Sequence, residues 1–358
     1  MLKFLTRRFA YGLLVLFGVV TVVFILFTIL PGDPARMMLG QRADLASVES
    51  IRKELGLDRP IHKQYLHYLN DISIISVHRV DDPRSLIYLD PESYDYQKII
   101  NTGKHSLVVK KPYLRRSYQS NRSVTDILIT AFPNTLLLAS VSILFAMILG
   151  VMLGTFIALQ RSAMLGRSAL IFSVLGMSLP SFFAAIIIAW VFAYLLGDYT
   201  GLNMTGSLME VDDFGRGEYM SLKNIILPAI TLGIRPLAIV TELTRSSLKK
   251  VMALDYIRTA RAKGLPEYRI ITRHAMKNAM NPVITAISGW FASLMAGAVF
   301  VEYVFDWKGI GVVVVDALEH YDFPVLMGAV LLISVVLVLV NIFVDILYAW
   351  LDPRVRLQ

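Results

Sequence analysis

The feature that most constrains this chain is a set of six long blocks that contain almost no charged residues. Each holds roughly the 20 apolar residues that a helix needs to cross a bilayer. Backbone in lipid must satisfy its own hydrogen bonds, and the blocks lack the alternation of barrel strands. The blocks are residues 9–30, 134–159, 169–196, 225–244, 283–301 and 325–350. The sequence therefore predicts an all-α integral membrane protein with six transmembrane helices.

The composition agrees with a membrane protein and removes several kinds of chemistry. Of the 358 residues, 56% are hydrophobic and 17% are charged, whereas soluble domains carry about 25% charged residues. The chain has no cysteine, which excludes disulfides, thiolate metal ligands and cysteine nucleophiles. Its net charge of +8 is compatible with nucleic acid or with a membrane surface. The positions of the basic residues favour the membrane.

Lysines and arginines gather in the short segments on the same side as the N-terminus. Residues 245–281 alone hold nine of them, whereas the two short loops of the opposite side hold Arg216, Lys223 and Lys308. Because basic loops stay in the cytoplasm, we expect an inner-membrane, multi-pass protein with both termini cytoplasmic. The first block is long for a cleaved signal peptide and ends in a proline-rich turn, so we predict an uncleaved span.

A long segment, residues 31–132, lies between the first two spans on the extracytoplasmic side. Residues 47–69 have helical periodicity. The polar, tyrosine-bearing stretch that follows is either a small strand-containing subdomain or a loosely ordered insert, and its pattern leaves both open. We predict an N-terminal helix at 1–30, this segment with an insert near 71–113, and a five-helix core at 133–358.

The cytoplasmic loop at 245–281 has the pattern of a helix, a break and a second helix. Gly264 is placed to end the first helix in a left-handed cap, and Pro266 fits the first turn of the next. The second helix, 267–280, carries Arg269, Arg273 and Lys277 at a spacing of four, which predicts one basic face. Such a lever can seat in a groove on a soluble partner. A solvated basic loop that merely follows the charge rule explains the pattern equally well.

Short motifs spread along the chain carry a family resemblance. The loop contains Arg258-Thr259-Ala260-Arg261-Ala262-Lys263-Gly264 and then His274-Ala275-Met276-Lys277-Asn278-Ala279. Further motifs are Leu30-Pro31-Gly32-Asp33-Pro34, Leu55-Gly56-Leu57-Asp58-Arg59-Pro60, Val301-Glu302-Tyr303-Val304-Phe305, Gly309-Ile310-Gly311, Tyr321-Asp322-Phe323-Pro324-Val325 and Leu351-Asp352-Pro353-Arg354. In this order they resemble the permease subunits of ABC importers, in the dipeptide, oligopeptide and nickel branch. The wider family has Glu-Ala-Ala where this chain has Arg258-Thr259-Ala260, a departure that is usual in the peptide branch.

The resemblance implies a type I ABC importer permease that moves peptides by alternating access. It implies that the coupling helix docks on a separate ATPase, through Asp255, Arg258, Thr259, Ala260, Ala262, Lys263 and Gly264. It also implies a second, homologous permease subunit and an extracytoplasmic solute-binding protein. The chain lacks the GxxxxGK[ST] loop that cradles nucleotide phosphates. We therefore expect no catalytic residue and no cofactor or metal on this chain, with ATP and Mg²⁺ bound by the partner.

Arg235 is the most unusual residue of the spans, because a charge near the middle of a membrane helix costs about 2.5–3.5 kcal/mol. One interpretation is that Arg235 lines the substrate path and meets a substrate carboxylate. The other is a structural pair, or a helix boundary that lies elsewhere. Gly233 and Pro236 predict a local break in this helix. Glu242, also assigned to the path, is placed to pair with Arg245 or with Arg235.

Other polar residues give weaker signals. Ser178, Pro180 and Ser181 are placed to kink the third span, although such groups more often only pack helices. Asp345 is expected to pair with a basic cytoplasmic group. Four acidic residues, Glu302, Asp306, Glu319 and Asp322, fall in a predicted outer loop and do not define a metal site. The six histidines show no metal-ligand spacing beyond the pair His62 and His67, which a solvated helix face explains better.

Three alternatives to peptide import remain. Nickel or another small solute is the main alternative cargo, because the coupling motif does not encode cargo. An ATP-independent secondary transporter would show inverted repeats with paired broken helices, and the sequence shows neither. A membrane-bound enzyme would place paired titratable groups inside the spans, where this chain has few and scattered ones.

Overall fold

A computed structural model describes residues 2–29, 35–36, 44–82, 85, 87–90, 94–160, 163–212, 215 and 217–351. The expected proline-rich end of the first span and the closing Asp352-Pro353-Arg354 motif lie outside these residues. The chain divides into two compact units. One comprises Met1–Ala10, Ala131–Val312 and Val335–Gln358, and the other comprises Tyr11–Thr130 and Val313–Ser334. We call them the helical unit and the sheet-bearing unit.

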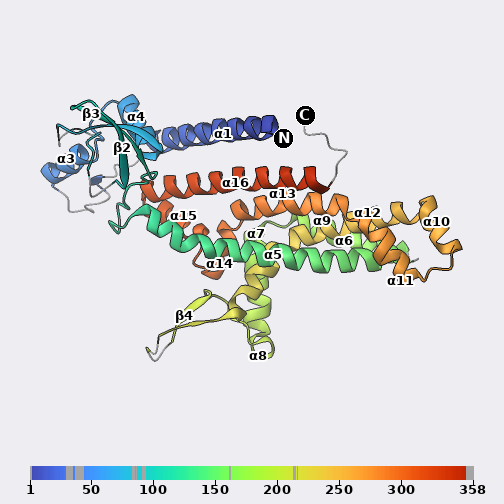
Figure 1. Cartoon of the computed structure of the whole chain (residues 1–358). Helices are drawn as coiled ribbons and strands as arrows, with labels where there is room; N and C mark the ends of the chain where they lie inside the picture. Colours follow the sequence, from blue (N-terminus) through green and yellow to red (C-terminus); the bar gives the residue numbers. More distant parts are fainter. Residues whose placement is uncertain are drawn as a thin grey trace. The chain divides into compact units, whose positions relative to one another are not determined.

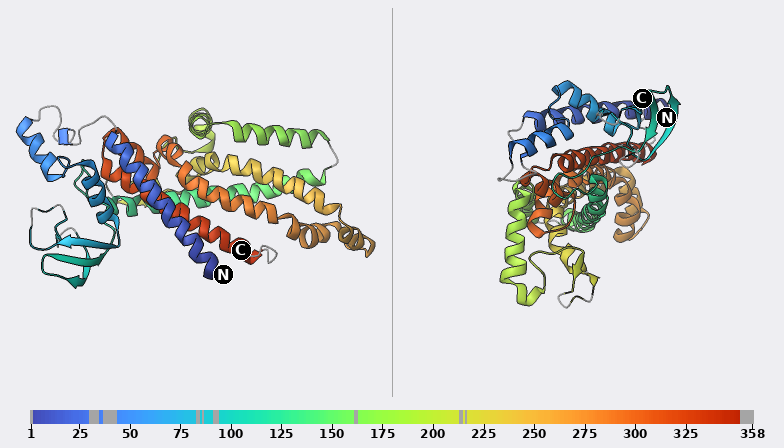
Figure 2. Two further views of the ribbon diagram at one scale, coloured as in Figure 1. Left: turned by 90° about the horizontal axis from the view of Figure 1, so that it is seen from above. Right: turned by 90° about the vertical axis from the view of Figure 1, so that its left-hand side faces the viewer.

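Long apolar helices build the helical unit (Figure 1). They are the greater part of α5 (Val124–Leu159), α6 (Ala163–Ser178), α7 (Ser181–Ile188), α9 (Ile226–Met252) and α13 (Asn281–Gly297). The α9 helix lies between α6 and α13 (Figure 2). The hydrophobic core of the helical unit includes Leu138, Ala185, Leu232, Val301 and Trp307. Of the candidate spans, α9 is the most enclosed, which fits its mixed polar and apolar sequence.

Two predicted spans are bent pairs of helices. In the third, residues 166–178 and 181–195 meet at 106°, because Pro180 cannot continue the helix and α7 starts again at Ser181. Of the two interpretations of Ser178, Pro180 and Ser181, the structure shows the bend, which is far sharper than a kink. In the fifth, α13 and α14 (Val299–Phe305) belong to a pair that bends by 59°.

Smaller elements complete the helical unit. After α7 come a π-helical turn, η1 (Ala189–Leu195), and a short helix, α8 (Gly197–Thr200). A hairpin of β4 (Met209–Val211) and β5 (Glu218–Met220) then leads through a 3₁₀ turn, η2 (Leu222–Ile225), into α9. The hairpin and the loop at residues 253–280 therefore lie at opposite ends of α9 (Figure 1).

By length and composition, four helices of the described residues can cross a membrane, or up to six if each bent pair counts as one span. The four are Thr6–Thr28, Val124–Leu159, Leu222–Met252 and Phe323–Ile346. The first lies within α1 (Leu2–Ile29) and the last within α16 (Phe323–Leu351). Near the N-terminus, Arg8 Nη1 lies 3.0 Å from Asp345 Oδ2. The expected pairing of Asp345 with a basic group is confirmed.

The insert of the sheet-bearing unit is a folded subdomain. Two helices, α3 (Leu45–Glu54) and α4 (Ile61–Ile72), precede a three-stranded antiparallel sheet of order β1-β3-β2. The strands are β1 (Ile75–Arg79), β2 (Tyr96–Asn101) and β3 (His105–Lys110). Of the two possibilities that the sequence left open, the structure selects the strand-containing one. Strand β3 is central because it pairs with both β1 and β2, and its residues Ser106, Val108 and Lys110 are buried.

A buried carboxylate, Asp71, holds this subdomain together. Arg115 donates to it through Nε at 3.0 Å and Nη2 at 2.9 Å, and the Tyr94 hydroxyl donates at 2.9 Å. Lys110 Nζ donates to the Asp71 carbonyl. Burial raises the pKa of the Tyr94 phenol, and that of Tyr68 to about 12, so both stay neutral. The charge that Asp71 brings into the interior is thus matched by arginine and by hydrogen bonds.

Candidate coupling loop and transport path

The loop after α9 forms an elbow of two helical arms. It comprises α10 (Asp255–Ala262), a turn at Gly264, and a second arm. Gly264 has φ +76°, the left-handed conformation that glycine adopts without strain, as predicted. Pro266 lies one position before the helix, as its N-cap residue, where its ψ of 142° is extended. The elbow therefore turns at the Gly-Pro pair that the sequence singled out.

The second arm departs from the predicted regular helix. It is a turn of α11 (Glu267–Arg269), a π-helical segment η3 (Ile270–Ala275) and a turn of α12 (Met276–Ala279). The π-helical segment places Ile270 and Ala275, five residues apart, in one buried cluster. Arg269, Arg273 and Lys277 are all exposed, but the change of period means that they do not follow the even spacing of an α-helix.

Apolar contacts seat the elbow on the end of the helical unit. Ile257 and Ala260 of α10 pack with Leu248 and Val251 of α9 and with the second arm. Ile257 is completely buried. Two polar contacts reinforce the packing: Asn278 Nδ2 donates to the Tyr256 hydroxyl at 2.9 Å, and Arg261 Nε donates to Glu267 Oε1 at 2.6 Å across the turn. These contacts join α10 to the end of α9 through a close-packed apolar cluster.

The residues predicted to couple to an ATPase divide into two groups. Ala260 is buried and faces the elbow's own core. The other six are exposed on α10 and its turn: Asp255, Arg258, Thr259, Ala262, Lys263 and Gly264. Asp255 and Arg258 lie 3.4 Å apart as an exposed pair. The structure thus exposes a small group of charged and small residues at the tip of the elbow.

Arg235 lies in the interior of α9, beside the break in the third span. Its Nη2 donates to the Leu179 carbonyl at 2.8 Å. That carbonyl precedes Pro180 and lies between α6 and α7, so the bend leaves it available to the arginine. The Nε of Arg235 is buried and has no hydrogen-bond partner among the described residues. Arg235 lines a cavity of about 80 Å³ together with Thr231, Trp290 and Ser293.

The predicted break beside Arg235 is wrong. The α9 helix is continuous from Ile226 to Met252 with Pro236 inside it. Gly233 instead permits close packing, since a Cβ there would lie 2.7 Å from the Phe145 ring and 3.0 Å from the Ser142 carbonyl of α5. The break that frees backbone near Arg235 occurs in the facing span, at Pro180. Glu242 pairs with Arg245 at 3.3 Å, the first of its two expected partners.

Two acidic residues assigned to an outer loop are buried. Glu302 is fully enclosed in the helical unit and accepts the Gly311 N–H at 2.6 Å. A Cβ at Gly309 would lie 2.4 Å from this carboxylate, so the motif needs glycine there. In the sheet-bearing unit, Asp322 is buried and accepts the Tyr118 N–H at 3.1 Å. Among the described residues, no group of three or more acidic residues or histidines can hold a metal.

Comparison with known proteins identifies the family. Residues 150–357 match the model of the binding-protein-dependent transport system inner membrane component, and residues 1–83 match the model of its N-terminal region. The chain therefore belongs to the inner-membrane components of binding-protein-dependent transport systems. It is a transport subunit of the ABC permease class and not itself an enzyme.

Individual relatives match over their whole length. The chain is 32% identical to a di/tripeptide transport system permease protein of Pseudomonas aeruginosa, over 100% of both chains. It is 35% identical to a probable D,D-dipeptide transport system permease protein of Escherichia coli, covering 98% of this chain and 96% of the relative. A glutathione transport system permease protein of Escherichia coli is 32% identical over 99% of both.

A solved structure supports the fold. The MetNI methionine ABC transporter in an inward-facing conformation matches 64% of this chain and 97% of its own chain, with a TM-score of 0.51 at 14% identity. This likeness establishes the type I ABC importer permease fold for the matched part.

Sequence reasoning missed three features of the site. The Leu179 carbonyl could have been anticipated as a partner of Arg235. Pro180 follows it and interrupts the helix, so this carbonyl lies at the break and is open to another donor. The Tyr256–Asn278 and Arg261–Glu267 contacts could not, since they depend on the angle between the two arms. The burial of Glu302 had one signal, the two glycines of Gly309-Ile310-Gly311 that allow its close approach.

Proposed function

We propose that this chain is the permease subunit of an ABC importer that moves di- or oligopeptides across the inner membrane. All three of the relatives reported above that match over their whole length are named for peptide or glutathione transport. Peptides share one chemical feature, a carboxylate beside an amide backbone. We propose that Arg235, inside the candidate span Leu222–Met252, meets this carboxylate. Arg235 and, further along α9, Glu242 are the residues that we assign to the path.

We propose six membrane spans with both termini in the cytoplasm, each bent pair forming one span. The basic loops support this orientation. The division proposed from the sequence has an N-terminal span at 1–30, an extracytoplasmic segment at 31–132 and a core at 133–358. Residues 245–281 then face the cytoplasm, where an ATPase is accessible.

The elbow carries the mechanism that we propose. A separate ATPase, holding ATP and Mg²⁺, would dock on the exposed residues of α10 and its turn, namely Asp255, Arg258, Thr259, Ala262, Lys263 and Gly264. Ala260 would contribute indirectly, because it is buried in the cluster that holds α10 against α9. Closure of the ATPase would push α10, and the packed joint at Ile257 and Leu248 would pass this movement to α9. Because α9 holds Arg235, the same movement would change the substrate path.

Two further partners complete the assembly that we propose: a second, homologous permease subunit and an extracytoplasmic solute-binding protein. The family description names binding-protein dependence, which supports the latter. A direct measurement of uptake distinguishes peptide from nickel as the cargo. Reconstituted transporter would accumulate labelled dipeptide, and excess Ni²⁺ would not compete.

The left-handed turn at Gly264 is the observation that carries the proposal, and replacing Gly264 is the test. Gly264→Val forces a β-branched residue into φ +76°, where it is strained, although no atom would clash with the new Cβ. We expect loss of ATPase association and of uptake with normal membrane insertion. Gly201→Val is the matched control, since Gly201 has φ +63° and equally open surroundings at the end of α8. Normal uptake by Gly264→Val would refute the coupling role.

A second experiment addresses Arg235. Arg235→Ala should impair uptake of a peptide with a free C-terminus far more than uptake of its C-terminal amide, while subunit assembly stays normal. If the variant transports both peptides with unchanged kinetics, Arg235 has no part in the path.

A further inference from the structure

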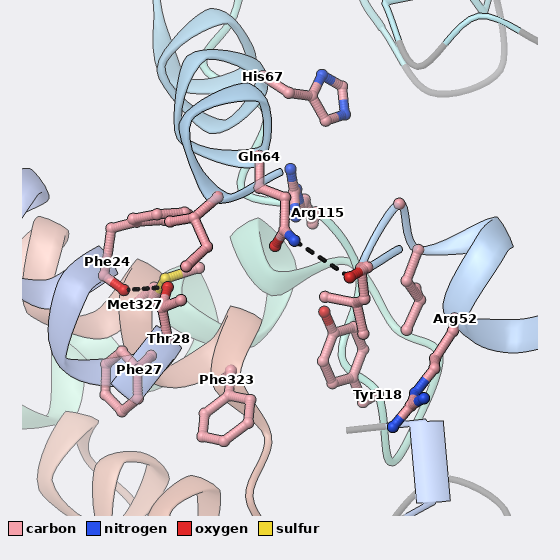
Figure 3. Close-up of a pocket in the computed structure, with 14 residues that line it drawn as sticks. Phe24, Phe27, Thr28, Arg52, Gln64, His67, Arg115, Tyr118, Phe323 and Met327 are labelled. Carbon is pink, nitrogen blue, oxygen red and sulfur yellow. Dashed lines mark hydrogen bonds between the residues drawn. The ribbon is translucent and has the colours of Figure 1, made fainter. Parts of the chain in front are cut away.

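The cavity beside Arg235 differs from the larger cavity of the sheet-bearing unit in what it leaves unpaired. The larger one has a volume of about 380 Å³, and Figure 3 shows its aromatic side chains, such as Phe27 and Phe323, below Arg115. Both Nε and Nη2 of Arg115 are already bonded to Asp71. The cavity of the helical unit instead borders an arginine whose Nε has no hydrogen-bond partner among the described residues.

Arg235 has one donor in use and one buried donor vacant. A guanidinium has five N–H groups, and Arg235 uses one of them, on Nη2, for the Leu179 carbonyl at 2.8 Å. The Nε–H remains, on the edge through which arginines bind carboxylates side-on. Because a buried donor without an acceptor is unfavourable, this edge favours a bound anion.

The rest of the lining is polar at a few points and otherwise apolar. Hydroxyls come from three different helices: Ser181 of α7, Thr231 of α9 and Ser293 of α13. The hydroxyls of Ser181 and Ser293 have no hydrogen-bond partner among the described residues. No acidic residue lines the cavity in the part of the chain that the structure describes. The lining therefore suits the carboxylate end of a peptide and not its ammonium end.

The size of the cavity limits what it can hold. Its volume is about 80 Å³, whereas sites that enclose a whole small molecule have roughly 300–1,000 Å³. A carboxylate and an α-carbon that bears hydrogen or a methyl group fit such a space, and an isobutyl or benzyl side chain does not. The apolar lining includes Ala184 and Ile234. A peptide can thus enter only with its last residue, and only if that residue is small.

We propose that this cavity is the subsite for the C-terminal residue of a transported peptide, with the carboxylate on Arg235 and the side chain against Ala184 and Ile234. The subsite selects glycine and alanine at the C-terminus. The N-terminal residue stays outside the cavity and is unrestricted by it. This inference rests on the proposed peptide transport and adds a specificity that a carboxylate contact alone does not give.

Uptake of dipeptides by the reconstituted assembly, with its ATPase and solute-binding protein, tests the subsite. Leu-Ala and Ala-Leu have the same composition, but only Leu-Ala ends in a small residue. The quantity measured is the ratio of kcat/KM for Leu-Ala to kcat/KM for Ala-Leu. The solute-binding protein is the same in every measurement, so its own preference cancels when a variant is compared with the unsubstituted chain.

Ile234→Ala enlarges the cavity and should admit the larger residue. We expect the ratio to fall about tenfold through faster uptake of Ala-Leu, the lower value for the effect of one methylene group in an apolar pocket. Ile239→Ala is the matched control, since Ile239 lies in the same helix and does not line the cavity. A gain of uptake cannot come from misfolding.

Ala184→Val makes the cavity smaller and should exclude alanine before glycine. We expect uptake of Ala-Ala to fall about tenfold relative to uptake of Ala-Gly. Ala193→Val, in η1 and outside the lining, should leave this second ratio unchanged. Co-purification of the subunits verifies that each variant assembles, and if Ala184→Val does not assemble, Ile234→Ala decides.

Two results would overturn the subsite alone: equal ratios for Ile234→Ala and Ile239→Ala, or equal loss of Ala-Ala and Ala-Gly uptake in an assembled Ala184→Val variant. In both cases the unsubstituted assembly still transports dipeptides, so the proposed function stands. If that assembly transports none of the four dipeptides, the proposed function fails and the subsite fails with it.

Discussion

The elbow and the sheet-bearing subdomain are held together by opposite means. The elbow buries apolar side chains such as Ile257 and Ile270 and keeps its charges on the surface. The subdomain encloses a charge, Asp71, and surrounds it with Arg115, Tyr94 and Lys110. A joint that transmits movement gains from close apolar packing, which resists deformation. A small sheet has little apolar core. A buried polar cluster specifies its structure, because the hydrogen bonds of that cluster are all made in one arrangement of the chain.

The largest effect should come from breaking the buried cluster. Asp71→Ala leaves Arg115 enclosed without its carboxylate, and loss of one partner of a buried pair costs about 3–5 kcal/mol. We expect local unfolding of the subdomain, seen as rapid amide exchange across α4 and β3. Asp95→Ala is the control, because its pair with Lys111 is mostly exposed. Equal exchange in the two variants would contradict the role of Asp71.

The corresponding change in the elbow removes apolar contact instead of charge. Ile257→Ala should destabilise the seating of α10 by about 2–5 kcal/mol, the usual cost of truncating a buried isoleucine. We expect faster proteolysis within residues 253–280 and weaker coupling of ATP hydrolysis to uptake. Leu254→Ala, at a half-exposed position just before α10, should have little effect. If both variants behave alike, the apolar joint is not what holds the elbow.

We also expect the folding stability of the sheet-bearing subdomain to depend on pH, whereas that of the elbow should not. Burial lowers the pKa of His67 and of His78 below the ordinary 6.5. The folded state therefore prefers neutral imidazoles, and the unfolded chain takes up protons more readily. Stability should be complete above about pH 6.5 and should fall as the pH drops from 6.5 toward the lowered folded pKa.

Amide exchange between pH 7 and pH 5 measures this effect. The groups facing the two imidazoles are Asp71, Arg115 and Lys110. Replacing both histidines by glutamine should flatten the profile of the subdomain and leave the elbow unchanged. An unaltered profile in the double variant would assign the acid sensitivity to the carboxylate.

The smallest effect should come from a surface charge of the elbow. Arg261→Gln removes the pair with Glu267, whose side chains are 45% and 57% exposed. Exposed pairs contribute about 0–1 kcal/mol, so thermal stability should hardly change. A loss as large as that of Ile257→Ala would show that charge, and not packing, fixes the turn.

The sequence predicted the features that local physics determines. Uncharged blocks gave the long apolar helices that are candidate spans. Gly264 followed by Pro266 gave the turn. Both features depend on neighbouring residues. The sheet order could not be predicted, since β1 and β3 pair across about 30 residues of chain. Pro236 misled because a packed helix such as α9 tolerates one missing hydrogen bond, whereas Pro180 at the end of α6 does not continue its helix.

The acidic residues show a second limit. Glu302 and Asp322 lie between apolar blocks, where a solvated loop is the ordinary expectation. Glu302 accepts an N–H from Gly311, nine residues further on. Asp322 accepts the Tyr118 N–H from a distant part of the chain. The coupling surface was predicted to include Ala260, but the helix turns this residue inward. Facing direction depends on how α10 packs on α9, and residue spacing alone does not fix it.

The central claim is that the tip of the elbow contacts an ATPase in the cytoplasm, and cross-linking tests it most directly. The chain has no cysteine, so Ala262→Cys introduces a unique thiol at an exposed position of α10. Tyr199→Cys, 90% exposed in α8 at the other end of α9, is the control. We predict nucleotide-dependent cross-linking from residue 262 to the ATPase and none from residue 199. Labelling of residue 262 in intact cells by a membrane-impermeant reagent, without any cross-link to an ATPase, would contradict the account.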